Sequence, residues 1–497
     1  MISIIGLAKK LFGHSLESPR TFRRNRIQAR YDAAQTTIEN RKHWAAADRL
    51  SADAACNSQV RVILRSRSRY EIANNSYARG IVLTLANYIV GTGPRLQVLT
   101  ENSDLNREIE SKFSEWMVAV GFARKLRLMR ASQTESGEVF GILATNPKIK
   151  SPVQLDVRVI EADQVATPLE LLMSSAQRIV DGIVFDDFDN PIFYHVLRHH
   201  PGSSAFDRGF SLNEFSVVPA ESVLHLFRVD RPGQSRGVPE FTSVLPLFAL
   251  LRRYTLAVLG SAEQAAIPGG VIYSDAPGEE QVVVDPMDTV ELERGSWLTM
   301  PAGWKMGQIK AEQPTTVYRE FKREVLNEIA RCVNMPFNIA AGNSSDYNYA
   351  SGRLDHQMFF RSIGVDRSRI TQLVLDPVFE AWMNEAVLMG GFLPQAARLL
   401  SFKASHQWIW DGFEHVDPAK EANAQGERLK NSATTLAVEY AKSGLDWENE
   451  IRQRGRELAL MREVGIPDQS QGNRADRNSN DRQRQEEIDQ LIEDANV

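Results

Sequence analysis

Long helix-like stretches alternate with short strand-like runs along this chain of 497 residues. Residues 20–80 contain long stretches without Pro or Gly, and within 72–89 the apolar residues recur at helical spacing. The Gly-Thr-Gly-Pro run at 91–94 should end that helix, and residues 95–100 then alternate like a strand. The start of the chain is therefore expected to be helical.

An α+β block is expected to follow, up to about residue 230. It should hold helices at 106–121 and about 124–136, and strands at 137–146, 154–165 and 219–228. Residues 181–198 contain two β-rich runs around the turn sequence Asp-Phe-Asp-Asn-Pro, which predicts a hairpin.

A loop rich in Arg, Pro and Gly then enters the most apolar predicted helix. Ser243 is a plausible N-cap, and Pro246 falls in the first turn, where its missing N–H costs nothing. The helix should continue to Ile267, so its roughly 24 residues span about 36 Å. Residues 244–251 are apolar nearly all round, and this end must therefore be buried from several sides.

About fifty residues of strand and turn material separate this helix from a second one at 317–334. Residues 338–353 are polar and lack periodicity, which predicts a loop. A long helix is expected at 354–389 with a kink near Pro377. Further helices are expected at 418–442 and 446–464, before a low-complexity stretch expected to be disordered.

The small net charge of −5 hides an uneven distribution. Residues 1–79 hold 15 Lys or Arg against 6 Asp or Glu, whereas residues 468–497 hold 4 against 8. A basic arm on an acidic body indicates a polyanionic or acidic partner near the arm. It does not indicate a surface built as a whole to grip DNA.

The two cysteines indicate the redox environment of the protein, and the apolar runs indicate whether it enters a membrane. Cys56 and Cys332 form neither a disulfide framework nor a Cys-based zinc site, so a reducing environment is expected. The first twenty residues are too short and interrupted for a signal peptide. No membrane span is expected, because the best apolar run, 241–251, stops at Arg252 and Arg253.

Motifs for cofactor or nucleotide chemistry are weak. The dipeptide Gly-Lys of a phosphate-binding P-loop never occurs, which argues against an ATPase. The Gly91-x-Gly93 pattern is better explained by a helix-ending turn than by a dinucleotide site. His195 and His199 are expected to be surface histidines. No cofactor is predicted.

Carboxylate pairs offer the remaining route to an enzyme. Asp186, Asp187 and Asp189 lack calcium-loop spacing and suit a solvated turn. Nuclease-like pairs are conceivable at Glu161 with Asp163 and at Asp417 with Glu421, although Asp417 before Pro418 is better explained as a helix N-cap. No catalytic or metal-binding residue is therefore assigned.

The RPGQSRG loop itself has two interpretations. Its arginines and glycines suit phosphate binding, but no helix N-terminus follows at once and no catalytic partner is evident. The favoured interpretation is an ordered hinge whose arginines pair with carboxylates of this subunit or a neighbour. The hinge residues are Arg231, Pro232, Gly233, Gln234, Arg236 and Gly237.

Several stretches together resemble the lambda-type family of tailed-bacteriophage portal proteins, over about residues 25–465. The most specific are RSRYEIANNSYARGIVLTLANYIVGTG and HLFRVDRPGQSRGVPEFTSVLPLF. The others are DGIVFDDFDNPIFYHV, MPAGW, FKREVLNEIARCVNMPF, SSDYNYASGR and WIWDGFEHVDPAKEANA.

The resemblance implies an α+β, mainly helical subunit of a ring oligomer, usually of twelve copies, at one capsid vertex. Its implied parts are an N-terminal arm (1–24), an α/β wing with a helical start (25–238), stem helix 1 (239–267), a β-containing clip (268–316), stem helix 2 (317–334), a tunnel loop (335–351), a long helix returning to the wing (352–417), a helical crown (418–466) and a disordered tail (467–497).

The implied function is a channel for packaging and ejecting double-stranded DNA, without bond chemistry. The implied partners are the terminase large subunit, major capsid and scaffold proteins, and head–tail connector proteins, in the virion and, during assembly, the host cytoplasm. Because each basic contact with phosphate would slow sliding DNA, the acidic body suits a conduit. Candidates for the channel wall are Lys322, Arg323, Arg331, Asn343, Ser344 and Asn348.

Two other classes of protein stay open at this point. One is an enzyme acting on phage DNA, such as a metal-dependent nuclease or a packaging motor. The other is a different structural head protein, for head completion, scaffolding or the capsid shell. For the basic channel candidates, the competing interpretation is a salt bridge between subunits.

Overall fold

The computed structural model describes residues 38, 40–168, 171, 178–203, 214–266, 270–274, 304–308, 317–345, 347–394, 397, 405–413 and 418–466. The chain divides into two units, Met1–Ser51 and Ala52–Val497. In the first unit, residues 40–46 form turns. The arm expected at 1–24 and the disordered stretch expected at 467–497 lie outside the described residues.

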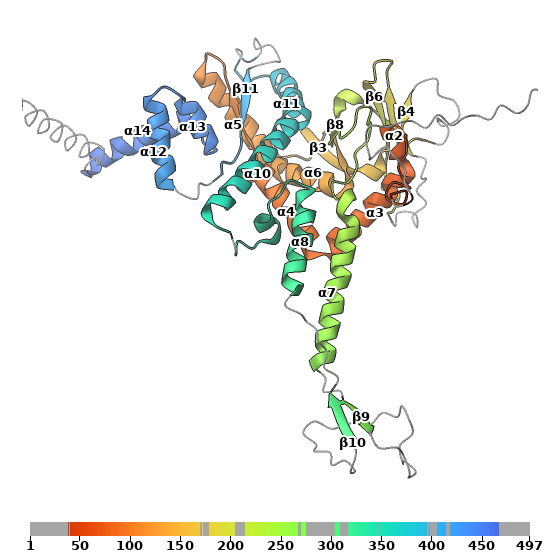
Figure 1. Cartoon of the computed structure of the whole chain (residues 1–497). Coiled ribbons are helices and arrows are strands. Elements are labelled where there is room, and N and C mark those ends of the chain that lie inside the picture. Colours follow the sequence, from red (N-terminus) through yellow and green to blue (C-terminus); the bar gives the residue numbers. More distant parts are fainter. Residues whose placement is uncertain are drawn as a thin grey trace, which may run out of the picture. The chain divides into compact units, whose positions relative to one another are not determined.

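Helices open the second unit (Figure 1). They are α2 (Ala52–Ala55), α3 (Ser58–Asn74), α4 (Ser76–Val90), α5 (Ser103–Ala119) and α6 (Phe122–Ser136). The expected periodicity at 72–89 is helical, but Asn75 breaks it. Its N–H caps α3 on the Glu71 carbonyl, and its side chain accepts hydrogen bonds from the Tyr77 and Ala78 amides at the start of α4.

Two antiparallel sheets follow these helices. The first has the order β3 (Leu155–Glu161), β2 (Glu138–Thr145), β8 (Val223–Phe227), and the second has the order β4 (Ile179–Val180), β5 (Ile183–Phe185), β6 (Pro191–Leu197), β7 (Phe215–Pro219). The predicted hairpin is confirmed as β5 and β6. Asp186 closes its turn by accepting from the Phe188 and Asn190 amides. The strand expected at 219–228 is β8, but it begins later than expected, because a 3₁₀ turn at Ala220–Ser222 separates it from β7.

The long apolar helix is α7 (Leu245–Ala266), and it lies beside α8 (Val317–Arg331) (Figure 1). The N-cap predicted at Ser243 is wrong, because Thr242–Val244 forms a 3₁₀ turn and the Ser243 hydroxyl lies 3.1 Å from the Cys332 sulfur. Of the strand material expected between the helices, β9 (Gly270–Ser274) and β10 (Trp304–Gln308) form an antiparallel pair.

The helical run after α8 starts earlier than predicted. Residues 338–353, expected as a loop, include most of α9 (Phe337–Ala341) and the start of α10 (Tyr349–Ile370). The sequence did not indicate these helices, because polar residues were interpreted as a loop. One of them, Asn348, is instead the N-cap of α10 and accepts from the Ser351 amide. A π-helical turn and α11 (Asp376–Leu388) follow α10. That turn directly precedes Pro377, where the kink was expected.

The last described helices differ from the prediction in number. Residues 418–442, expected as one helix, form α12 (Pro418–Lys430) and α13 (Leu436–Lys442), followed by α14 (Trp447–Val464). Ser432 adopts a left-handed φ of 51°, and the Thr435 hydroxyl caps α13 by accepting from the Val438 amide. This turn chemistry ends one helix and starts the next.

The larger apolar core is shared by α4, α5, α6, α8, α10 and α11. Phe113 lies at its aromatic centre, 5.3 Å from Trp116 and 5.1 Å from Trp382 between ring centroids. Strand β1 (Arg95–Val98) pairs antiparallel with β11 (His406–Ile409). The segment between α4 and α5 therefore lies beside the segment between α11 and α12. A smaller core around Phe140 and Tyr194 lies between the two sheets.

Candidate functional site: two buried charge clusters at the root of the long helix

The loop between β8 and α7 carries Arg236, one of the predicted hinge residues, into the interior. Its side chain is fully buried. Nε donates to both Glu138 oxygens, at 2.9 and 3.0 Å, and the two Nη groups donate to the Val165 and Ala162 carbonyls, each at 3.2 Å. The expectation that hinge arginines pair with carboxylates is therefore confirmed for Arg236. The same burial contradicts phosphate binding by this arginine.

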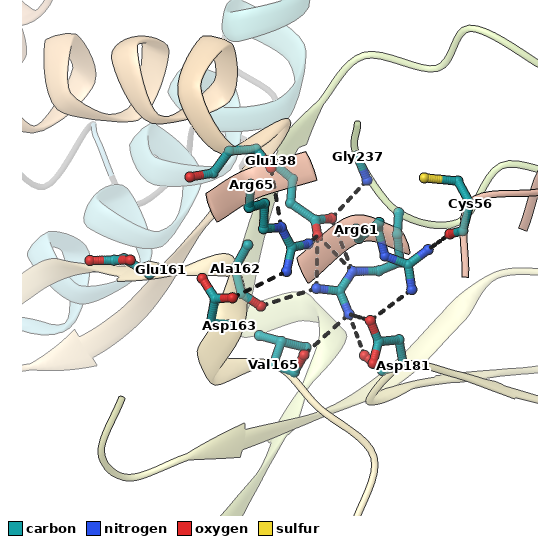
Figure 2. A network of polar contacts seen from close by, with 12 residues as sticks. Cys56, Arg61, Arg65, Glu138, Glu161, Ala162, Asp163, Val165, Asp181 and Gly237 are labelled. Atoms are coloured by element: carbon teal, nitrogen blue, oxygen red, sulfur yellow. Dashed lines mark hydrogen bonds and ion pairs between the residues drawn. The ribbon is translucent and has the colours of Figure 1, made fainter. Parts of the chain in front are cut away.

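Glu138, the first residue of β2, is the centre of this arrangement (Figure 2). It accepts from the Gly237 amide at 2.9 Å, pairs with Arg65, and lies 2.9 Å from His225 Nε2. Burial by itself would raise the pKa of the Glu138 carboxyl, but Arg236, His225 and Arg65 hold that pKa well below its usual value. We call Glu138, Arg61, Arg65, Asp163, Asp181, His225 and Arg236 the Glu138 cluster.

Helix α3 supplies its arginines every four residues, on one buried face. Arg61 pairs with Asp181 at 2.7 Å, and Arg65 Nη1 lies 3.7 Å from Asp163 (Figure 2). The next arginine on this face, Arg69, donates to Asp163 at 2.6 Å. Our sequence analysis missed these residues. Their spacing at positions 61, 65 and 69 was a usable signal, because it places three charges on one face of a helix.

A second buried cluster follows four residues after Arg236. Glu240 accepts from Arg130 at 3.1 Å, from Gln133 at 3.0 Å and from the Thr134 hydroxyl at 2.8 Å, all on α6. Arg130 also pairs with Asp366 of α10 at 3.1 Å. We call these five residues the Glu240 cluster. Burial opposes ionisation of Glu240, but Arg130 and Arg228 keep its pKa below the usual value.

Two glycines allow the loop to approach β2 this closely. Gly137 has a φ of 88°, and a Cβ there would lie 2.6 Å from the Pro239 nitrogen. A Cβ on Gly237 would lie 2.6 Å from the Glu138 Cβ. Side chains at these positions would separate the Gly237 amide from the Glu138 carboxylate, so the clusters depend on both glycines.

The exposed part of the hinge is held by Gln234. Its Oε1 accepts from the Asp230 and Arg231 amides at 2.8 and 3.2 Å, and its Nε2 donates to the Arg236 carbonyl at 2.9 Å. Pro232 and Gly233 are exposed at the tip, where Gly233 has a φ of 76°. The loop is thus an ordered connection, fixed at its tip and at both clusters.

The six predicted channel residues lie in two segments, three on α8 and three in the loop that leads to α10. Lys322 Nζ lies 5.0 Å from the centre of the Tyr77 ring, and the Arg323 guanidinium lies 5.3 Å from that of Phe337. These half-buried cations lie over aromatic rings of their own chain. Arg331 is exposed and donates to the Asn334 side chain at 2.9 Å.

The polar candidates lie in the short loop between α9 and α10. Asn343 and Ser344 are exposed. The Asn343 side chain accepts from the Ser345 amide at 2.9 Å. Asn348, predicted as a channel residue, serves as the cap of α10. This loop therefore presents two polar side chains from positions that backbone contacts fix.

Among the described residues, Glu161, Asp163 and His200 form a group with metal-ligand chemistry, their ligand atoms within 4.8 Å of one another. Arg69 already contacts Glu161 at 3.0 Å and Asp163 at 2.6 Å. A cation would compete with this guanidinium for the same oxygens, so the nuclease-like interpretation of Glu161 and Asp163 gains no support. Asp417 lies outside the described residues, and Glu421 pairs with Arg428 at 2.7 Å.

The surface of α7 is unusually apolar. Leu250, Leu256 and Leu259 are 57%, 61% and 55% exposed. Among the described residues, 242–263 is the one helical stretch long and apolar enough to cross a membrane by length and composition. Arg252 lies in its middle and donates to Glu71 of α3 at 2.9 Å. That ion pair fits a helix attached to the protein body, and the leucines mark a surface to be covered.

Comparison with known proteins gives concordant matches. Residues 39–367 match the model of the phage portal protein, lambda family. The chain is similar to a probable portal protein of Halomonas phage phiHAP-1, with 25% identity covering 81% of each chain. It is also similar to portal protein B of Escherichia phage lambda, with 20% identity covering 80% of this chain and 83% of the relative.

Solved structures match at lower similarity. A chain from the virion of a native gene transfer agent particle has 13% identity and a TM-score of 0.46, with 82% of this chain and 99% of that chain covered. A chain from the neck of a native gene transfer agent particle, computed with C12 symmetry, has 13% identity and a TM-score of 0.44, with 78% and 94% covered. The lambda-family model, in contrast, spans more than half of the sequence, and this chain belongs to the lambda family of phage portal proteins.

Proposed function

We propose that this portal protein assembles as a ring of twelve identical subunits around a channel that passes double-stranded DNA into and out of the capsid. The observation that carries the ring is the apolar surface of α7. Leu245, Phe248 and Leu251 are buried by the subunit itself, yet Leu250, Leu256 and Leu259 are not. Apolar side chains grouped in this way mark an interaction surface.

The position of these leucines favours a ring over a simple pair. Leu256 and Leu259 are three residues apart and share a face of the helix, whereas Leu250 lies on a different face. Helix α3 adds a further apolar surface, because Arg61 and Arg65 point inward and Val62 and Ile63 are about half exposed. Head-to-tail contacts in a ring need two different surfaces on each subunit, and these patches supply them.

The parts of the subunit take the roles that the family resemblance implies. Residues 25–238 would form the wing, 239–267 and 317–334 the stem, 268–316 the clip, 335–351 the tunnel loop, 352–417 the return to the wing and 418–466 the crown. The two buried clusters join β2, α3, α6 and α10 to the start of α7. In this role they would hold the stem at a fixed angle to the wing.

DNA would pass the channel with few strong contacts. Arg331, Asn343 and Ser344 are exposed and suit the channel wall, whereas Lys322 and Arg323 lie against aromatic rings. Few basic contacts mean little counterion release and weak holding of the sliding duplex. The family is structural, and the pairing of Glu161 and Asp163 with Arg69 agrees with a subunit that performs no bond chemistry.

The motor and the docking partners would be separate proteins. We assign the driving force to a terminase large subunit, and the docking partners to major capsid, scaffold and head–tail connector proteins. No membrane is part of this proposal. Assembly would take place in the host cytoplasm, and the finished ring would remain in the virion at one vertex.

Electron microscopy of the purified full chain tests the ring. We expect rings with a central hole, and we expect Leu256→Glu to reduce them to smaller species without unfolding the subunit. Val118→Glu is the matched control, because Val118 is 80% exposed on the wing helix α5. A wild-type chain that is monomeric by analytical ultracentrifugation, or rings that survive Leu256→Glu unchanged, would contradict the proposal.

A further inference from the structure

A pocket with aromatic walls lies between α10, the residues after β11, and the helices α12 and α13. Its volume is about 620 Å³, within the range of small-ligand and peptide side-chain pockets. Four half-buried aromatic side chains line it, Phe360, Trp408, Trp410 and Phe413. Neither the channel nor the subunit contacts proposed above use this pocket.

The walls are held in place by contacts behind them. Phe360 and Phe413 stack with ring centroids 4.0 Å apart and an interplanar angle of 11°. The Arg367 guanidinium lies 4.9 Å from the Phe413 centroid and donates to the Ile89 carbonyl at 3.0 Å. Asp411 accepts from the Thr92 amide at 2.6 Å. These contacts within the chain fix the positions of the pocket walls.

The rim is positively charged. Arg353, Arg367, Lys420 and Lys442 line the pocket, against the two acidic residues Asp411 and Glu421. Asp411 accepts from Thr92 and Glu421 pairs with Arg428, whereas Lys442 pairs with Glu439 at 2.8 Å and keeps a side chain that is 55% exposed. The ligand that this pocket fits is therefore apolar on one side and acidic on the other.

One segment of the same chain has that chemistry. Residues 486–494, EEIDQLIED, carry five carboxylates and no basic residue. Ile488, Leu491 and Ile492 stand at positions i, i+3 and i+4, so a helical turn would gather them on one face. The carboxylates of Glu487 and Glu493 would flank that face.

The segment can reach the pocket of its own subunit. Helix α14 begins at Trp447, close in sequence to the pocket residue Lys442, and its 18 residues span about 27 Å. The 22 residues from Ile466 to Ile488 can extend over roughly 70 Å. The connection is therefore more than twice as long as the helix that it must run back along. A tether of this kind gives the segment a high effective concentration at the pocket.

We propose that residues 486–494 dock into the aromatic pocket of their own subunit. Ile488, Leu491 and Ile492 lie against the aromatic walls, and the carboxylates face Lys420 and Lys442. Docking depends on the pocket and the segment only. It can therefore fail while the ring forms, and it can hold in a subunit that forms no ring.

A cysteine pair in the full chain tests the docking directly. Ala424 lines the pocket, so we expect Ala424→Cys with Leu491→Cys to form a disulfide under mild oxidation, within one chain. Ala433→Cys with Leu491→Cys is the control, because Ala433 is exposed and lies outside the pocket. Equal yields for the two pairs would overturn the proposal. A disulfide that joins two chains would also overturn it, and would assign the pocket to a contact between copies.

Charge reversal supplies a second measurement. Lys442→Glu should lower the yield of the Ala424–Leu491 cross-link about fivefold, and adding Glu493→Lys should restore it. Lys430→Glu is the control for the charge change alone, since Lys430 pairs with the exposed Glu427 at 2.7 Å and lies outside the pocket. Because Lys442 pairs with the buried Glu439, restoration by Glu493→Lys separates recognition of the segment from local disruption. If Lys430→Glu lowers the yield as much as Lys442→Glu, the charge recognition is refuted.

Discussion

The Arg236 guanidinium lies 2.7 Å from the Glu138 carboxylate, and neither side chain is exposed to solvent. Arg236→Met takes the strongest counter-charge away from the buried Glu138 carboxylate and leaves it with Arg65 and His225. Loss of one partner from a buried ion pair costs about 3–5 kcal/mol. We therefore expect Arg236→Met to lower the free energy of unfolding strongly, and to lower the melting temperature in calorimetry.

An exposed ion pair provides the control for this variant. Arg198 lies 3.3 Å from Glu214, with the two side chains 67% and 46% exposed, and Arg198→Met should cost less than about 1 kcal/mol. The double variant of Arg236→Met with Glu138→Leu should recover part of the loss, since it also removes the buried carboxylate and leaves Arg65 with Asp163, 3.7 Å away, as its carboxylate. Equal melting temperatures for Arg236→Met and Arg198→Met would show that the buried pair contributes little.

Gly237→Ala tests the close approach of the hinge loop to β2. The added Cβ would lie 2.6 Å from the Glu138 Cβ, so the Gly237 amide must move away from the carboxylate it binds. We expect a loss of stability of roughly 1–3 kcal/mol from overpacking. Gly80→Ala in α4 is the control, because a Cβ there meets nothing within 4 Å, and a helical alanine should be neutral or stabilising.

The burial of Glu110 on α5, near Asp446 and Glu448 at the start of α14, predicts a pH dependence of stability. Burial, followed by the nearby carboxylates of Asp446 and Glu448, raises the pKa of Glu110 to about 7, although the Val98 amide donates to it at 2.7 Å. Between pH 4.5 and 7 the folded state therefore holds a proton that the unfolded state has released. Stability should fall as the pH rises through this window.

Melting curves between pH 5 and pH 8 measure this effect. Glu110→Gln should flatten the decline in melting temperature, because it removes the group that titrates. Glu108→Gln is the control, since Glu108 is exposed on the same helix α5. A decline that persists unchanged in Glu110→Gln would assign the titration to another group.

The sequence analysis predicted the apolar helices well because their periodicity is local. Helices α5, α6 and α7 and the β5–β6 hairpin all lie close to where their patterns indicated. Errors arose at side-chain caps and turns. Thr435 starts a helix inside a range that looks continuous, and Asn348 starts one inside a range that looks like a loop. Single hydrogen bonds decide these boundaries, and average composition does not register them.

The buried charge clusters could not be predicted from local sequence patterns, because their members are far apart along the chain. Arg236 was expected to pair with a carboxylate, but nothing in the sequence identified Glu138, 98 residues earlier, as its partner. Glu138 and Glu240 look like ordinary surface residues in the sequence, and burial became visible only when β2, α3 and α6 were placed together. The ring contacts of Lys322 and Arg323 were equally hidden in the sequence, because Tyr77 is distant from Lys322 along the chain and Phe337 follows a turn after α8.

Asn343 and Ser344 test the proposed channel. Both are exposed in the loop between α9 and α10, and the Asn343 amide is fixed by the Asn338 carbonyl at 3.0 Å. We expect Asn343→Ala with Ser344→Ala to leave ring assembly intact, because neither side chain belongs to the apolar surfaces. Particles built with this variant should lose packaged DNA faster, measured as DNA that a nuclease can digest after filling. Ser111→Ala on α5 is the control. Normal DNA retention by the double variant would contradict a role for this loop in holding DNA.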